Sequence, residues 1–359
     1  ARCNPARKVA TVRLKMGRDR VQYGPGLQSL LLSDWATDAY ALQADWSFWK
    51  LRYHQRFAQL IDFIPGKADI AGDYPRKYGV WHQLAYKPVP QVELALFEGV
   101  IYADRLPNAR RGFELQYLNP LIFYRAAEQA VGSPDNGLLG AQLRIDLAQK
   151  ARVYGQLVVD DFNFAQRKNG RYWWGNKYGW QLGAKYLDVF GLSGLDLQVE
   201  CNRIRPYLYS HFNTAAAYTH FGQPLAHPHG ANLTEFIIKV RWLISPKLLL
   251  SWEGAMLLQG IDSPGRNFGA DLYRSNLVRD NGQINPDFDN QTLQGDSRQV
   301  LRANLQVSWQ LGSWPAWIDG LLGWRHEQSS STRLDWRPRS DFQCTLQLRW
   351  NMPVRRALY

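Results

Sequence analysis

The most regular pattern of apolar and polar positions lies near the end of the chain, between Asp341 and Met352. Apolar side chains occupy one parity of this segment and polar side chains the other: Phe342, Cys344, Leu346, Leu348, Trp350 and Met352 against Asp341, Gln343, Thr345, Gln347, Arg349 and Asn351. Successive side chains of a β-strand point to opposite faces, so the pattern predicts a strand with one apolar and one polar face. The segment is about twice as long as a usual soluble strand and suits a tilted strand that crosses a bilayer.

The same alternation recurs along the chain. Clear examples are residues 139–147, 195–201, 236–244 and 301–311. Less regular candidates lie near 9–17, 39–48, 49–62, 78–87, 91–102, 151–160, 177–188, 247–260 and 316–327. Together these segments predict roughly fourteen strands of about ten residues each.

The connections between these segments are of two kinds. Short turns are expected at 148–150, 190–194 and 245–247, and long connections at 18–38, 103–136, 161–176, 204–231 and 261–297. Short turns at one end and long loops at the other are typical of an outer-membrane barrel, whereas uniformly long strands without helices fit a soluble sandwich poorly. Several long connections contain apolar runs, and we expect these to fold into the lumen as a plug.

Composition is compatible with this architecture. The chain has 15 Trp and 18 Tyr, residues that favour a membrane–water boundary, although a carbohydrate-binding or other aromatic-rich soluble β-protein would also contain many. The mean hydropathy of −0.40 does not argue against a barrel, because half of the strand residues would face a polar lumen. No run of about 18 consecutive apolar residues is present, which excludes a transmembrane helix.

We expect residues 1–359 to form a single β-barrel domain, since no linker or low-complexity tract interrupts the pattern. The chain starts without Met and without a secretory apolar segment, so we expect a mature or truncated form that lacks its signal peptide. The three cysteines, Cys3, Cys201 and Cys344, have no metal-ligand spacing and suggest no disulfide framework.

Several connecting segments together resemble the capsule-assembly Wzi family, in the form common in Bacteroidetes. These are GRDRVQYGPGLQSLLLSD (17–34), LNPLIFYRAAEQAVGSPDNGLLG (118–140), WWGNKYGWQLGAKY (173–186), NRIRPYLYSHF (202–212) and YTHFGQPLAHPHGAN (218–232). The resemblance covers roughly residues 10–350. It implies an outer-membrane β-barrel of about eighteen strands with a blocked lumen, which holds capsular polysaccharide as a lectin. Because about fourteen strands are counted here, we expect either strands before residue 1 or strands that the pattern does not reveal.

The polar strand faces carry candidate ligands for an anionic glycan. Arg144, Arg152, Arg302 and Arg349 would line the lumen, and a guanidinium group pairs bidentately with carboxylates. The net charge of +12 would favour an acidic polysaccharide or lipopolysaccharide. The competing interpretation is that these arginines brace the wall through ion pairs, for which four acidic partners are available: Asp146, Asp160, Glu200 and Glu235.

Aromatic residues in the long connections are candidates for stacking on sugar rings. They are Tyr172, Trp173, Trp174, Tyr207 and Tyr209. The alternative is that these rings form the core of the plug. Tryptophans at strand ends, such as Trp242, Trp309 and Trp350, are expected to form the membrane girdle instead.

Other chemistry has little support in the sequence. His220, His227 and His229 fit no standard zinc spacing, so hydrogen-bonded or pH-sensitive loop histidines are expected and no metal or cofactor. No G-x-S-x-G motif is present, and the adjacent Asp160 and Asp161 would point to opposite faces of a strand, so we expect no enzyme. The basic residues are dispersed, which argues against nucleic acid as a partner.

The leading hypothesis is therefore a non-catalytic protein of the bacterial outer membrane that binds or anchors capsular polysaccharide. Its expected partners are this polysaccharide, outer-membrane lipid and lipopolysaccharide. Two alternatives remain open. One is a porin-like solute channel, and the other is a scaffold subunit in a larger envelope complex for secretion or uptake.

Overall fold

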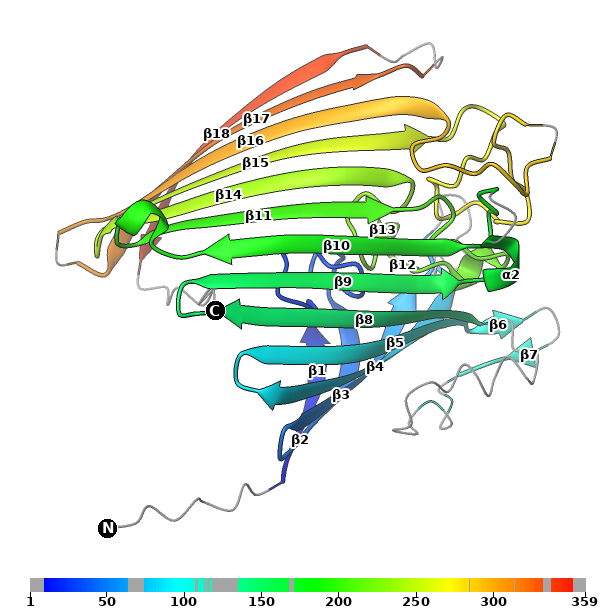
Figure 1. Cartoon of the computed structure of the whole chain (residues 1–359), viewed down its shortest axis with the longest axis horizontal. Coiled ribbons are helices and arrows are strands. Elements are labelled where there is room, and N and C mark those ends of the chain that lie inside the picture. Colours follow the sequence, from blue (N-terminus) through cyan, green and yellow to red (C-terminus); the bar gives the residue numbers. More distant parts are fainter. Residues whose placement is uncertain are drawn as a thin grey trace.

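A curved antiparallel sheet of 14 strands dominates the computed structural model of the chain (Figure 1). The structure describes residues 10–63, 74–106, 109–112, 114, 117, 135–167, 171–283, 285–312, 314–331 and 337–350. Every neighbour in the sheet is the next long strand along the chain, so the topology is a simple up-and-down meander. Within the described ranges β1 and β18, the two end strands, do not pair with each other, and the sheet is open along that side.

The sheet contains all fourteen of the expected strands. They are β1 (Thr11–Asp19), β2 (Ala39–Phe48), β3 (Leu51–Ile61), β4 (Arg76–Val89), β5 (Val92–Ala103), β8 (Asn136–Leu147), β9 (Ala151–Asp161), β10 (Lys177–Tyr186), β11 (Leu195–Ile204), β14 (Leu233–Ser245), β15 (Leu248–Ile261), β16 (Asp296–Gln310), β17 (Ala316–Ser329) and β18 (Arg339–Trp350). The remaining elements are short: β6 (Arg105–Leu106) with β7 (Ala109–Arg110), β12 (Thr219–His220) with β13 (Gln223–Pro224), α2 (Phe164–Arg167), η2 (Val189–Gly191) and η3 (Thr214–Ala216). The sequence pattern therefore predicted the wall of the barrel correctly.

The two faces of the wall follow the alternation in the sequence. In β18 the apolar parity points outward, with Phe342 82% and Leu346 78% exposed. The register places Cys344 beside Leu322 of β17, which is exposed as well. Such exposure of large apolar side chains on a monomer is explained by contact with lipid. The described part of the chain has no helix that is long and apolar enough to cross a membrane.

Connection lengths differ between the two ends of the sheet (Figure 1). Short turns, at one end, are residues 49–50, 90–91, 148–150, 187–194, 246–247 and 311–315. Long connections, at the other end, are residues 20–38, 62–75, 104–135, 162–176, 205–232, 262–295 and 330–338. Short turns face the periplasm and long loops face outward in outer-membrane barrels, so the long-loop end is the extracellular end.

Residues 20–38 and 205–232 fold inward and form the predicted plug. Leu30, Leu31 and Tyr218 are fully buried in one core that also includes Trp81 and Phe97 from the inner face of the wall. Polar contacts connect the plug to the wall as well. The Glu200 carboxylate accepts hydrogen bonds from the amides of Leu27 (2.6 Å) and Gln28 (3.0 Å). Both the apolar core and these hydrogen bonds hold the plug in place.

One part of the outer face is covered by the protein itself. Val80, Val100 and Tyr102 form a second core on the outward side of β4 and β5, together with Phe57 and Tyr117. The ring of Tyr102 stacks on Tyr117 with centroids 4.9 Å apart. Tyr117, which follows β5 in the chain, therefore covers part of this outward patch, which the alternation alone did not indicate.

Candidate functional site

The four predicted arginines lie on the inner face of the wall, and all of them form ion pairs. The closest contacts are Arg152 with Asp146 (2.5 Å), Arg349 with Asp319 (2.7 Å), Arg302 with Glu253 (3.5 Å), and Arg144 with Asp146 (3.7 Å) and Glu93 (3.9 Å). These contacts favour the bracing interpretation, since each positive charge already has a carboxylate partner.

The four expected acidic partners make different contacts. Asp146 pairs with arginine, whereas Asp160 binds Lys177 at 2.8 Å. Glu200 holds the plug amides, and Glu235 contacts His227 Nε2 at 2.9 Å. The remaining arginine partners come from neighbouring strands, because the register of the sheet decides which charges lie side by side.

Tyr207 and Tyr209 lie inside the plug. Their exposed fractions are 1% and 0%. Tyr207 Oη donates to the Asn267 carbonyl (2.9 Å), and Tyr209 Oη donates to the Leu30 carbonyl (2.8 Å). Burial raises the pKa of both phenols, so they stay protonated donors. In this structure neither ring has a free face that a sugar could stack on.

The other three predicted aromatics lie together at the extracellular end. The connection that carries Tyr172, Trp173 and Trp174 is held by the loop of residues 262–295. The Trp174 amide donates to the Asp287 carbonyl, and the Asn290 amide donates to the Tyr172 carbonyl, both at 2.9 Å. The Arg279 guanidinium lies 3.9 Å from the Trp174 ring centroid, so Trp174 serves the packing between the two loops.

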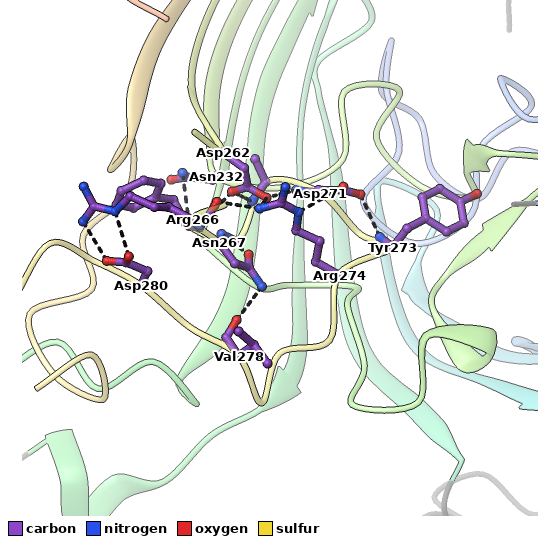
Figure 2. Close-up of polar contacts among 12 residues, drawn as sticks. Asn232, Asp262, Arg266, Asn267, Asp271, Tyr273, Arg274, Val278 and Asp280 are labelled. Carbon is purple, nitrogen blue, oxygen red and sulfur yellow. Dashed lines mark hydrogen bonds and ion pairs between the residues drawn. The ribbon is translucent and has the colours of Figure 1, made fainter. Parts of the chain in front are cut away.

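The loop of residues 262–295 is itself cross-linked by polar contacts (Figure 2). Asp262 accepts hydrogen bonds from three backbone amides, the closest being that of Phe268 at 2.7 Å. Arg266 forms a bidentate pair with Asp280 (2.7 and 2.8 Å), and Asn267 Nδ2 donates to the Val278 carbonyl (2.7 Å). These contacts hold the loop together, and the loop in turn holds residues 172–174 beside it.

A pocket of about 740 Å³ opens next to Tyr172 and Trp173. Its lining is Leu139, Leu157, Val159, Phe162, Phe164, Arg171, Tyr172, Trp173, Asn176, Tyr178 and Arg205. Tyr172 is 54% exposed, so one face of its ring is open to a ligand. Aromatic rings and two guanidinium groups therefore meet in one cavity at the extracellular end.

Arg205, which the sequence reasoning did not single out, is the central charge of this pocket. Its side chain is only 7% exposed, and its guanidinium lies 5.7 Å from the Tyr172 ring centroid and 5.4 Å from that of Tyr178. Nη2 donates to the carbonyls of Asn290 (2.9 Å) and Trp173 (3.4 Å). Nε is buried without a hydrogen-bond partner, and no carboxylate of the described ranges pairs with this arginine. The only signal in the sequence was its position directly after a strand, within the run NRIRPYLYSHF.

A buried guanidinium that has no carboxylate partner and lies beside aromatic rings is suited to an anionic ligand. Burial of an unpaired charge is costly, and a carboxylate or phosphate would offset that cost with charge-assisted hydrogen bonds. Arg171 is a weaker candidate, because it already pairs with Asp289 at 2.6 Å.

The three loop histidines are held by ordinary contacts. His227 Nε2 contacts Glu235, and His220 Nδ1 accepts a hydrogen bond from the Ile61 amide at 3.0 Å. Burial lowers the pKa of His220 to about 4 and that of His229 to about 3, so both are neutral at pH 7. Over the described ranges, no group of three or more His, Cys, Asp or Glu residues is placed to hold a metal ion.

No protein-family model and no curated protein sequence matches this chain. Among solved structures it is similar to Wzi of Escherichia coli, an outer-membrane protein involved in group 1 capsule assembly and described as a carbohydrate-binding β-barrel. The TM-score is 0.58 at 14% identity, over 92% of this chain and 65% of Wzi. The chain thus spans slightly less than two thirds of that protein.

Two other solved structures, the second an outer-membrane channel, give lower scores. OccD3 (OpdP) of Pseudomonas aeruginosa has a TM-score of 0.46 at 13% identity, over 94% of this chain and 74% of its own. DcaP of Acinetobacter baumannii has a TM-score of 0.39 at 11% identity, over 94% and 96%. The fold and the apolar exterior define the class: this is a β-barrel of the bacterial outer membrane with a plugged lumen.

Proposed function

We propose that this protein binds an acidic surface polysaccharide, of the capsular kind, at its extracellular end and holds it there without catalysis. The observation that carries the proposal is Arg205, a buried guanidinium without a carboxylate partner in a pocket that it shares with Tyr172 and Trp173. The resemblance of the connecting segments to the Wzi family of Bacteroidetes and the fold likeness to Wzi support it further. Membership in that family and a single barrel domain are part of the same proposal.

The predicted aromatic residues at the extracellular end and the predicted arginines have different roles in this proposal. Tyr172 and Trp173 line the pocket directly, and Trp174 supports them through the adjoining loop. Arg144, Arg152, Arg302 and Arg349 contribute to wall stability instead, since each has an acidic partner. We therefore assign recognition of the glycan to the extracellular pocket and not to the lumen.

The test measures binding of acidic capsular polysaccharide to the purified protein, and capsule retention in a deletion strain. Arg205→Gln and Tyr172→Ala should each weaken binding at least ~10-fold, because they remove the anion partner and the stacking face. Arg203→Ala is the matched control, since this exposed arginine lies two positions before Arg205 and outside the pocket lining. Unchanged capsule retention after deletion would refute the proposal.

A solute channel is the second candidate, since the inner wall near the short turns is polar and basic. Ion-paired arginines line it, and such a surface would also suit a conduit for anions. The plug argues against this function, because wall and plug share a core and several hydrogen bonds. Large steady open steps in a planar bilayer would favour the channel.

A further inference from the structure

The floor of the extracellular pocket is formed by the outward face of the wall. Leu139 lies opposite Val159 in the pairing of β8 with β9, and Leu157 belongs to the same outward parity as Val159. The inward neighbours Gln156 and Val158 are buried against the plug, whereas Leu157 is 46% exposed. The pocket therefore opens sideways toward the outer leaflet as well as upward toward the exterior.

A second cavity continues from this floor along the membrane side of the wall. It has a volume of about 990 Å³, and Leu157 lines both cavities. Its lining includes small residues such as Gly155 and Ala184 and larger apolar residues such as Leu143, Leu182 and Phe236. A shallow apolar groove, defined by this second cavity, thus runs from the aromatic pocket along the lipid-facing surface of β8 to β14.

We propose that the ligand of this site is an acylated anionic glycan of the outer leaflet, with its anionic saccharide against Arg205 and an acyl chain in the groove below. This inference rests on the proposed function and specifies its ligand class. Leu157 lines both cavities, so they adjoin and one amphiphile can extend across both.

The chemistry of the two parts selects such an amphiphile. The upper part offers Arg205 without a carboxylate partner, an open Tyr172 ring and the amide of Asn176. The lower part offers almost only apolar side chains, which a soluble saccharide would leave uncovered. A neutral lipid would fill the groove but leave the buried charge unpaired. A single ligand that is both acylated and anionic satisfies the two halves at once.

The experiment uses the whole protein in nanodiscs of zwitterionic phospholipid, so that the surrounding lipid brings no net charge that competes for Arg205. The probes are rough lipopolysaccharide, its fully deacylated saccharide phosphate and an uncharged alkyl glycoside, and binding is measured by native mass spectrometry and by calorimetry. Lipopolysaccharide should bind at least ~10-fold more tightly than either other probe, since each buried methylene and the ion pair add to affinity.

Two substitutions locate the site. Val159→Trp would fill the pocket floor, and Arg205→Gln would remove the charge; each should weaken lipopolysaccharide binding at least ~10-fold. Val307→Trp is the matched control, because Val307 lies on the outward face of β16, outside the lining of both cavities. The control should bind lipopolysaccharide as the unmodified protein does.

The outcomes separate this inference from the proposed function. If the deacylated saccharide binds as tightly as lipopolysaccharide and still depends on Arg205, the acyl requirement is refuted and the glycan site stands. If the affinity for lipopolysaccharide is unchanged in both variants, the pocket and groove are refuted as the lipopolysaccharide site. If no anionic saccharide, acylated or not, depends on Arg205, both proposals fail.

Discussion

Trp81 Nε1, on the inner face of β4, donates a hydrogen bond of 2.6 Å to the phenolic oxygen of Tyr218 in the plug. Tyr218 Oη in turn donates to the Leu31 carbonyl at 2.7 Å. This single hydroxyl therefore connects the wall with both segments of the plug. All three residues are buried, so each polar group depends on this contact for its hydrogen bond.

Removing that hydroxyl should destabilise the barrel. Tyr218→Phe leaves the Trp81 N–H and the Leu31 carbonyl without this partner, at a cost of about 1–3 kcal/mol. Urea unfolding in lipid vesicles, followed by tryptophan fluorescence, measures the change. Tyr186→Phe is the control, because Tyr186 lies exposed at the short-turn end and should change stability little. Equal stability of the two variants would show that the contact is dispensable.

The plug should block steady conductance, and loosening it should open the lumen. We expect the unmodified protein to show no steady open steps in a planar bilayer. Glu200→Ala removes the acceptor for the Leu27 and Gln28 amides and should produce intermittent openings. Gln198→Ala is the matched control on the same strand, since Gln198 donates to Tyr154 Oη and not to the plug. Openings in the control alone would contradict this role of Glu200.

The bracing role of the lumen arginines can be tested with Arg349 and Asp319, which are bidentate partners at 2.7 and 3.0 Å. Both side chains are largely buried. A double-mutant cycle of Arg349→Ala and Asp319→Ala should give a coupling energy of about 1 kcal/mol in the free energy of unfolding. Polysaccharide affinity should stay within about twofold, since the pair lies outside the pocket lining. A large loss of affinity with little coupling would favour ligand binding over bracing.

The plug histidines should make stability depend on pH. Burial lowers the pKa of His220 to about 4 and of His229 to about 3, below the value of about 6.5 in an unfolded chain. The unfolded state therefore binds more protons at acidic pH, so stability is fully present above pH ~6.5 and declines as the pH falls toward these folded values. Between pH 7.5 and 5 we expect a loss of about 1–2 kcal/mol for each histidine.

The measurement is urea unfolding at the two pH values for the unmodified protein, His220→Gln and His229→Gln. Each variant should reduce the difference between pH 7.5 and pH 5, because glutamine does not titrate. An unchanged difference in both variants would assign the pH dependence to other groups.

Much of the fold was predictable because the governing pattern is local. The alternation over Asp341 to Trp350 identifies a strand and its lipid face without reference to any other part of the chain. The same holds for the short turns and for the apolar connections that form the plug. Ion pairs were harder to predict, since Glu253 and Asp319 become partners of arginines only through the register between strands.

The candidate site depended on contacts between distant segments. Tyr209 looked as suitable for sugar stacking as Tyr172, but Tyr209 is buried in the core of the plug, where it donates to the carbonyl of Leu30, 179 positions away. Arg205 belongs to no recognisable motif, and it is distinguished by its burial, by its unpartnered Nε and by the rings of Tyr172 and Tyr178 beside it.

The strands, their outward and inward faces and the end that carries the long connections follow from the sequence pattern alone. The reason is that every strand that spans a bilayer needs apolar side chains at alternate positions, and this alternation is a local pattern that the sequence shows directly. Which aromatic rings are buried in the plug, and which remain accessible beside Arg205, became known from the folded structure. Those outcomes depend on how the long connections pack against each other and against the wall, which no local pattern records.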